Sequence, residues 1–163
     1  AGLQRIDELF KGRVRTLPMT VHALEEEIVD ADIIIGAVLV PGGRTPVLIT
    51  REMLKTMKRG SVIVDVAVDQ GGCIETSRPT THDDPVYEVD GILHYCVANM
   101  PGAYPRTSTI ALTNATLPYV KLLANGGIDR AIAEDAEIRS ALNTYQGKIT
   151  NGVLAEAMGF TAL

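Results

Sequence analysis

Apolar and polar residues alternate in blocks along the first hundred positions of the chain. Apolar residues recur at helical spacing in three stretches: residues 1–12, 20–31 and 50–60. Apolar runs typical of strands occupy four more: residues 13–17, 32–40, 61–69 and 91–99. Thr20 and Thr50 stand where the N-caps of the second and third helices are expected. Strands that alternate with helices predict βαβ units and a mostly parallel sheet.

The pattern changes beyond residue 100, where the strand signals stop. Three stretches predict helices: residues 107–127, 128–147 and 150–159. Pro118 lies inside the first of them and should bend or restart it, because proline has no N–H for the helical ladder. We therefore expect the chain to leave the sheet near residues 100–107.

The composition favours an α/β protein. Of the 163 residues, 46% are hydrophobic and none is Trp, so aliphatic side chains and Met must fill the core. Such a mixture is common where parallel strands are buried on both faces. The formal charge of −5 gives no basic surface for nucleic acid. No apolar run reaches the roughly 20 residues of a membrane span, and no signal peptide is visible, so we expect a cytoplasmic protein.

The cysteines and histidines carry no metal-site or nucleophile signal. Cys73 and Cys96 are two residues without a disulfide framework, and we expect both to be reduced thiols. His82 lies in a polar loop and His94 in a strand, and neither has a partner at ligand spacing. We predict no metal site and take both histidines as non-catalytic.

Three segments combine the end of an apolar strand with small and polar residues: "AVLVPGGRTP", "DVAVDQGGCIETSRP" and "YCVANMPGAYP". Ligands of open α/β sheets bind outside the carboxyl ends of the strands. Strand alternation places Asp65, Ala67 and Asp69 on one side of the second segment. Asp69 stands at its end, where a turn cap and a functional carboxylate are equally good interpretations. Asp65 fits a structural role, bonding a neighbouring loop from partial burial.

Two other polar residues near these strand ends have open interpretations. Arg78 could hold a phosphate or carboxylate as a bidentate fork, although a surface ion pair with Glu75 or Asp83 is the commoner role for such a residue. Asn99 could donate its amide to a ligand or form an Asx turn. No G-x-G-x-x-G fingerprint follows any strand. The pattern by itself predicts half of a nucleotide-binding α/β domain followed by helices.

Two motifs, "VDQGGCIETSRPTTHDDP" and "ANMPGAYPRTSTIALTNAT", resemble the C-terminal portion of bacterial alanine dehydrogenases. The likeness runs from about Ile6 to the end of the chain. It implies the fold class α/β, with a partial Rossmann-like parallel sheet that forms the second half of an NAD-binding domain. On this basis residues 1–103 would be the later part of that domain. Residues 104–163 would be C-terminal helices that return to the substrate domain.

The resemblance also implies an activity. The family uses NAD to oxidise L-alanine to pyruvate and ammonium, and it forms homo-oligomers, often hexamers. Asp69 matches the family's catalytic aspartate, and Arg78 matches an arginine that contacts the cofactor. The positions implied to bind NAD are Val38, Leu39, Val66, Ala67, Val68, Asp69, Arg78, Val97, Ala98, Asn99 and Met100.

Truncation is the main departure from the family. Its glycine fingerprint, its substrate-binding arginine and lysine, and its catalytic histidine all precede the point that matches Ala1. Because the chain begins inside a helical pattern, we expect a processed, engineered or fragmentary chain that is inactive alone. Two alternatives stay open: an NAD-binding module like the transhydrogenase α-subunit, and a non-catalytic α/β binding module.

Overall fold

The computed structural model describes residues 2–160 and divides into two compact units. The first unit contains the residues up to Val38 together with Thr45–Ala98. The second contains Leu39–Arg44 and the residues from Asn99 onward.

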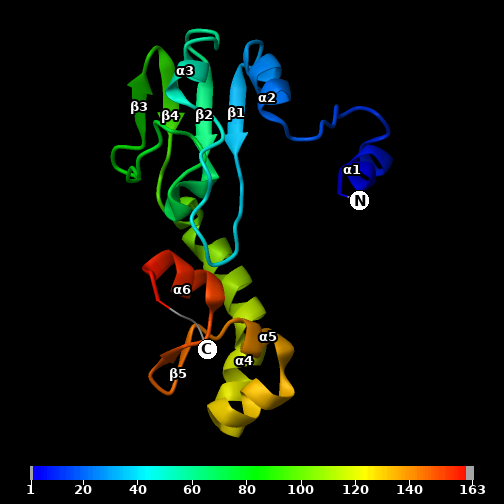
Figure 1. The fold of residues 1–163 in the computed structure, drawn as a ribbon, viewed down its shortest axis with the longest axis vertical. Coiled ribbons are helices and arrows are strands. Elements are labelled where there is room, and N and C mark those ends of the chain that lie inside the picture. The colour runs from blue at the N-terminus through cyan, green and yellow to red at the C-terminus, as the bar shows by residue number, and fades with distance from the viewer. Residues whose placement is uncertain (1, 161–163) are drawn as a thin grey trace. The chain divides into compact units, whose positions relative to one another are not determined.

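The first unit is built on a four-stranded sheet (Figure 1). Its strands are β1 (Ile33–Gly36), β2 (Val62–Asp65), β3 (Val86–Val89) and β4 (Ile92–Tyr95). The strand order is β1-β2-β4-β3, with β1, β2 and β4 parallel and β3 antiparallel to β4. The prediction of a mostly parallel sheet is confirmed.

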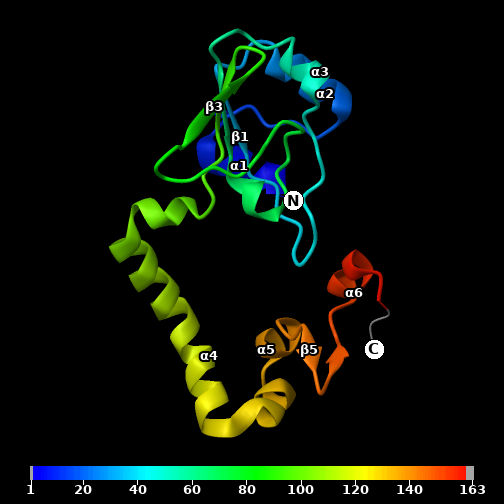
Figure 2. The ribbon, with the colours of Figure 1, turned by 90° about the vertical axis from the view of Figure 1, so that its left-hand side faces the viewer.

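Two helices cover one face of this sheet, α2 (Val21–Ile28) and α3 (Arg51–Leu54) (Figure 2). The core between helices and sheet includes Leu54 from α3, Ile63 from β2 and Ile92 from β4, all fully buried. Aliphatic side chains therefore form the core, as the composition requires.

The helix starts follow from threonine caps. The Oγ1 of Thr20 accepts from the backbone N–H of Ala23 at 3.1 Å, and the Oγ1 of Thr50 accepts from that of Met53 at 3.3 Å. Both predicted N-caps are confirmed. The first predicted helix is also present, as α1 (Gly2–Phe10).

The opposite face of the sheet is exposed in this chain, contrary to the expectation of burial on both faces. Ile33 and Ile35 of β1 are 63% and 66% exposed, and Leu93 of β4 is exposed as well. Strand side chains alternate between faces, so these residues point away from the core. Both helices of the core lie on the other side.

Four strand predictions need correction, one of them 91–99, whose strand β4 ends at Tyr95. Residues 13–17 form no strand: β1 is the edge of the sheet, and no ladder partner for this segment exists within residues 2–160. The predicted strand 32–40 ends at Gly36, before the turn residues. The predicted strand 61–69 ends at Asp65, whose side chain caps the segment that follows.

The antiparallel strand β3 falls between the predicted strands 61–69 and 91–99, where the sequence pattern predicts no element. Val89 pairs with Ile92, which leaves Asp90 and Gly91 as a two-residue turn. Both turn residues have positive φ, 54° and 87°. Asp-Gly suits this turn because both residues tolerate the left-handed region.

The second unit is dominated by the helical segment α4 (Pro105–Glu134), preceded by the short 3₁₀ helix η2 (Met100–Ala103). The backbone stays helical through Pro118 and breaks at Gly127, where φ is 73° and ψ is 168°. The predicted restart at Pro118 is therefore wrong. Glycine adopts positive φ without steric cost, whereas proline only removes one ladder bond.

The remaining elements of the second unit are α5 (Ala136–Ser140), β5 (Thr144–Tyr145), β6 (Lys148–Ile149) and α6 (Gly152–Met158). The helix predicted over 128–147 is thus wrong beyond α5, where a small hairpin turns at Gln146 and Gly147 with φ of 49° and 77°. The last predicted helix is present as α6. No helix within residues 2–160 combines the length and hydropathy that crossing a bilayer requires.

Candidate active site at the strand ends

The carboxyl ends of β1, β2 and β4 lie at one edge of the sheet, because the three strands are parallel (Figure 1). Gly36 at the end of β1 pairs with Asp65 at the end of β2, and Val64 pairs with Tyr95 at the end of β4. The segments that follow these residues therefore emerge side by side. This edge is where ligands bind in open α/β sheets.

Most of the predicted site residues follow these strand ends. Eight belong to the first unit: Val38, Val66, Ala67, Val68, Asp69, Arg78, Val97 and Ala98. Three belong to the second: Leu39, Asn99 and Met100. In the first unit, the side chains of Ala67 and Val97 are buried, so these residues can offer only their backbone to a ligand. Asp69 and Arg78 are exposed.

Asp69 lies on the 3₁₀ helix η1 (Val66–Gln70), which directly follows β2. Its side chain is exposed, while that of Asp65 is 0% exposed. The expectation that Asp65 and Asp69 share one side by strand alternation is wrong, because the strand ends at Asp65 and the chain turns into a helix. The turn leaves the carboxylate of Asp69 at the rim, accessible to solvent.

The carboxylate of Asp65 organises this turn. Its Oδ1 accepts from the backbone N–H of Ala67 at 3.0 Å. Its Oδ2 accepts from the N–H of Cys73 at 2.9 Å and from the hydroxyl of Ser77 at 2.6 Å. The structural role expected for Asp65 is confirmed, with full burial in place of the partial burial expected. Buried carboxylates require such donors to offset lost hydration.

The loop after η1 passes so close to Asp65 that glycine is needed there. Gly72 has a φ of +78°, and a Cβ added to it would lie 2.9 Å from Asp65 Oδ2. Its backbone N–H donates to the carbonyl of Ala67 at 3.0 Å. The "GG" pair of the sequence therefore ends η1 and lets the loop close over the carboxylate.

Arg78 stacks on an aromatic ring. Its Cζ lies 4.1 Å from the centroid of the Tyr87 ring, and its backbone N–H donates to the Tyr87 hydroxyl at 2.9 Å. Of the two ion pairs considered for Arg78, with Glu75 and with Asp83, neither is present among the described residues. Glu75 instead accepts from the backbone N–H of Arg51 at 2.7 Å.

His94 is a buried structural residue. Its Nδ1–H donates to the carbonyl of Ile92 at 3.0 Å, so its Nε2 accepts the hydroxyl hydrogen of Thr76 at 2.8 Å. Burial lowers the pKa of His94 below its ordinary value, which keeps the ring neutral in this tautomer. His82, by contrast, is exposed in its loop.

Both cysteines are buried free thiols, as expected. Burial, reinforced by the neighbouring carboxylate of Asp65, raises the pKa of Cys73 to about 11. The thiol therefore stays protonated at neutral pH, which disfavours a nucleophilic role because the thiolate is the reactive form.

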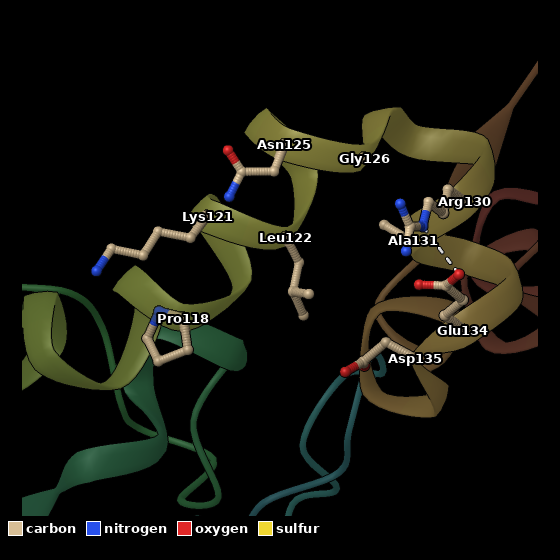
Figure 3. Close-up of a pocket in the computed structure, with 9 residues that line it drawn as sticks. All are labelled: Pro118, Lys121, Leu122, Asn125, Gly126, Arg130, Ala131, Glu134 and Asp135. Carbon is tan, nitrogen blue, oxygen red and sulfur yellow. Dashed lines mark hydrogen bonds and ion pairs between the residues drawn. The ribbon is translucent and has the colours of Figure 1, made fainter.

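In the second unit, Asn99 adopts a left-handed conformation with φ of 54° and ψ of 52°. It borders a hollow of about 630 Å³ formed with η2 and the first turns of α4. Another pocket, of about 440 Å³, lies between the two arms of α4 on either side of Gly127 (Figure 3). Arg130 and Glu134 form an ion pair of 2.8 Å in this pocket, which contains no predicted site residue.

Within the part of the chain that the structure describes, no three His, Cys, Asp or Glu residues gather as a metal site would require.

Tyr87 is the residue near the site that sequence reasoning missed. The signal was present as "VYEVDGILHY", in which an Asp-Gly turn separates two runs of strand-forming residues. Recognising that hairpin would have placed Tyr87 beside His94, with which it pairs across the strands.

Comparison with known families and proteins agrees with this geometry. Residues 1–152 match the family model described as alanine dehydrogenase/PNT, C-terminal domain. Alanine dehydrogenase of Halomonas elongata is 58% identical over 157 residues, which cover 96% of this chain and 42% of that protein. Alanine dehydrogenase of Staphylococcus haemolyticus is 52% identical over 158 residues, with the same coverage. The chain thus spans less than half the length of these relatives.

Solved structures give the same result. An L-alanine dehydrogenase structure matches with a TM-score of 0.81 and 46% identity over 96% of this chain and 43% of its own. A transhydrogenase from Sinorhizobium meliloti matches with a TM-score of 0.54 and 34% identity. That match covers 64% of this chain and 32% of the transhydrogenase.

Replacing Asp65 by alanine should destabilise the first unit strongly. Asp65→Ala leaves the buried N–H groups of Ala67 and Cys73 and the half-buried hydroxyl of Ser77 without their acceptor, and each loss of a buried partner costs about 1–3 kcal/mol. We expect the free energy of unfolding, measured by urea denaturation, to fall by about 3 kcal/mol or more. The exposed Asp83→Ala is the matched control and should change it by less than about 0.5 kcal/mol. Equal effects of the two substitutions would contradict the role of Asp65.

The raised pKa of Cys73 should make stability depend on alkaline pH. The thiol of the unfolded chain has an ordinary pKa of 9.0, whereas the pKa of folded Cys73 is raised to about 11. The free energy of unfolding should therefore fall as the pH rises through this window. In Cys73→Ser, where no thiol titrates, the fall should be smaller by on the order of 2 kcal/mol. Parallel pH profiles for the two proteins in urea denaturation would show that the thiol is not perturbed.

Proposed function

The chain belongs to the alanine dehydrogenase/PNT C-terminal domain family, and from this premise we propose that it is the C-terminal part of an NAD-dependent alanine dehydrogenase. The reaction would be the reversible oxidative deamination of L-alanine to pyruvate and ammonium. The observation that carries this proposal is the exposed carboxylate of Asp69, placed on η1 at the carboxyl edge of the parallel sheet.

Asp69 would act at the reacting amino acid. Positive charge develops on the amine nitrogen as the Cα–H bond breaks, and a carboxylate close by stabilises that charge or transfers protons. The geometry supports this role in two ways. The side chain of Asp65 caps η1 by accepting from the backbone N–H of Ala67, and Asp69 is an exposed residue on the same short helix.

NAD would supply the hydride acceptor. The strand-end segments fit a planar ligand, because they present small or aliphatic residues and backbone at one sheet edge with few polar side chains. We propose that the residues which hold NAD are Val38, Leu39, Val66, Ala67, Val68, Asp69, Arg78, Val97, Ala98, Asn99 and Met100. Arg78 is the positively charged residue of this set. Its guanidinium can donate two parallel N–H bonds to oxygen acceptors of the cofactor.

The wider assignments belong to the same proposal. Residues 1–103 would complete an NAD-binding domain, and residues 104–163 would return to a substrate domain. Relatives more than twice as long as this chain support that division. A cytoplasmic homo-oligomer is the form in which we expect the full-length enzyme to act.

A transhydrogenase-like module is the second candidate, supported by the likeness to the Sinorhizobium meliloti protein. The dehydrogenase is favoured because relatives of that name match 96% of the chain at 52–58% identity. Assays with L-alanine and with a second nicotinamide dinucleotide separate the two, since only a dehydrogenase reduces NAD in the presence of alanine alone.

The 163-residue chain by itself should have no measurable alanine dehydrogenase activity. Hydride transfer requires cofactor and amino acid to be held in a near-attack geometry, and Asp69 cannot also bind the carboxylate of alanine. The measurement is NADH absorbance with L-alanine and NAD, with a full-length relative as positive control. Turnover by the isolated chain would contradict this expectation.

In a full-length enzyme that carries this sequence, Asp69→Asn should lower kcat more than cofactor affinity. We expect kcat to fall by about 100-fold or more, since an amide neither carries the charge nor transfers the proton. The KM for NAD should change by less than about threefold. Steady-state kinetics with Asp84→Asn, an exposed loop carboxylate, provide the control. Unchanged turnover of Asp69→Asn would remove Asp69 from the mechanism.

A further inference from the structure

The hydroxyl of Tyr87 forms hydrogen bonds with the backbone of the loop that contains Arg78. The Tyr87 hydroxyl donates to the carbonyl of Thr76 at 2.9 Å and accepts from the backbone N–H of Arg78 at 2.9 Å. One side chain therefore bonds the backbone on both sides of Ser77, whose own hydroxyl donates to Asp65. The backbone at Arg78 is held from two directions as a result.

The ring of Tyr87 also holds the guanidinium. Arg78 Cζ lies 4.1 Å from the ring centroid, within the range of a cation–π contact. The ring in turn stacks on His94, with centroids 5.0 Å apart and an interplanar angle of 22°. His94 is fully buried and bonded through both nitrogens, so it gives Tyr87 a rigid support.

The contact with Tyr87 leaves hydrogen-bond donors of Arg78 available. A guanidinium carries five N–H donors, and a cation–π contact of its Cζ with a ring does not use them as hydrogen bonds. No ion pair within residues 2–160 engages the guanidinium. An arginine held in one orientation loses less side-chain freedom when it binds an oxygen acceptor than a mobile arginine does.

We propose that Tyr87 is a positioning residue for cofactor binding: it fixes both the backbone and the guanidinium of Arg78, so that the N–H edge of Arg78 meets an oxygen of the nicotinamide dinucleotide. The inference rests on the proposed function, and within it Tyr87 acts only through Arg78. Tyr87 itself touches neither cofactor nor substrate in this scheme. Burial raises the pKa of Tyr87 above its ordinary value, so the hydroxyl keeps its donor hydrogen across the working pH range.

The test is a double-mutant cycle in a full-length enzyme that carries this sequence. The variants are Tyr87→Leu, Tyr87→Phe, Arg78→Ala and the double variant Tyr87→Leu/Arg78→Ala. NADH affinity is measured by fluorescence titration, and KM for NAD and kcat by steady-state assay. Glu88→Gln, an exposed neighbour on β3, is the matched control and should behave as wild type.

We expect Tyr87→Leu to weaken NADH binding about fivefold, the size that loss of one cation–π contact and its orienting bond implies. The KM for NAD should rise in parallel, and kcat should change by less than about twofold. Tyr87→Phe keeps the ring and should recover part of the loss. In the Arg78→Ala background, Tyr87→Leu should have no further effect on NADH affinity.

Several results would overturn the proposal. Additive losses in the double variant would mean that Tyr87 acts independently of Arg78. A lower thermal midpoint with unchanged NADH affinity would mean that Tyr87 only stabilises the fold. Should Tyr87→Leu fail to fold, Tyr87→Phe decides: affinity equal to wild type contradicts the role of the hydroxyl in positioning Arg78.

Failure of the proposed function is distinguishable from failure of this inference. If the enzyme binds NADH but does not oxidise alanine, the proposed reaction is wrong and the cycle still decides the role of Tyr87. If Arg78→Ala leaves NADH affinity unchanged, the inference is overturned while alanine oxidation can stand. If wild type binds no NADH, both are wrong.

Discussion

The buried carboxylate of Asp65 is the constraint on which the rest of the strand-end region depends. A carboxylate withdrawn from water is strongly unfavourable unless donors replace its hydration, and here the donors come from Ala67, Cys73 and Ser77. Meeting that requirement forces the chain to turn immediately after β2 and to fold its next loop back over the strand end. The polar residue inside an apolar run is therefore what shapes the edge of the sheet.

Two exposed side chains receive their positions from this arrangement. Asp69 projects from η1, whose first turn is capped by Asp65. Arg78 follows Ser77, which bonds Asp65, and it is then held by Tyr87 from the hairpin. The hydrogen bonds to Asp65 hold the chain from Ala67 to Ser77, and the ring of Tyr87 holds Arg78, the next residue. Preorganisation of this kind allows a few side chains at a rigid edge to bind a ligand without first being ordered.

Much of the apolar surface of this chain lies outside its own core. Ile33 and Ile35 face outward from the sheet, and α4 contains a single buried residue, Ala131, among those described. Exposed apolar surface on this scale is typical of contact with further protein. The chain spans 42% of the length of its Halomonas elongata relative. Under the proposed function, the strand-end edge would be one contribution to a larger site, and its residues would position a cofactor without forming a complete amino-acid pocket.

The sequence by itself determined the alternation of strands and helices and the threonine caps of α2 and α3, and it proposed the strand ends as the place for chemistry. These features follow from local spacing and from hydrogen bonds between near neighbours, such as Thr20 with Ala23. Only the tertiary structure decided that Asp65 is buried while Asp69 is exposed, that Gly127 and not Pro118 breaks α4, and that the ring of Tyr87 contacts Arg78. Each of these depends on contacts across the sheet or on a backbone angle chosen by packing, as when Ser77 reaches Asp65. Spacing along the chain does not identify such partners, because they come into contact only when the strands and loops have assembled.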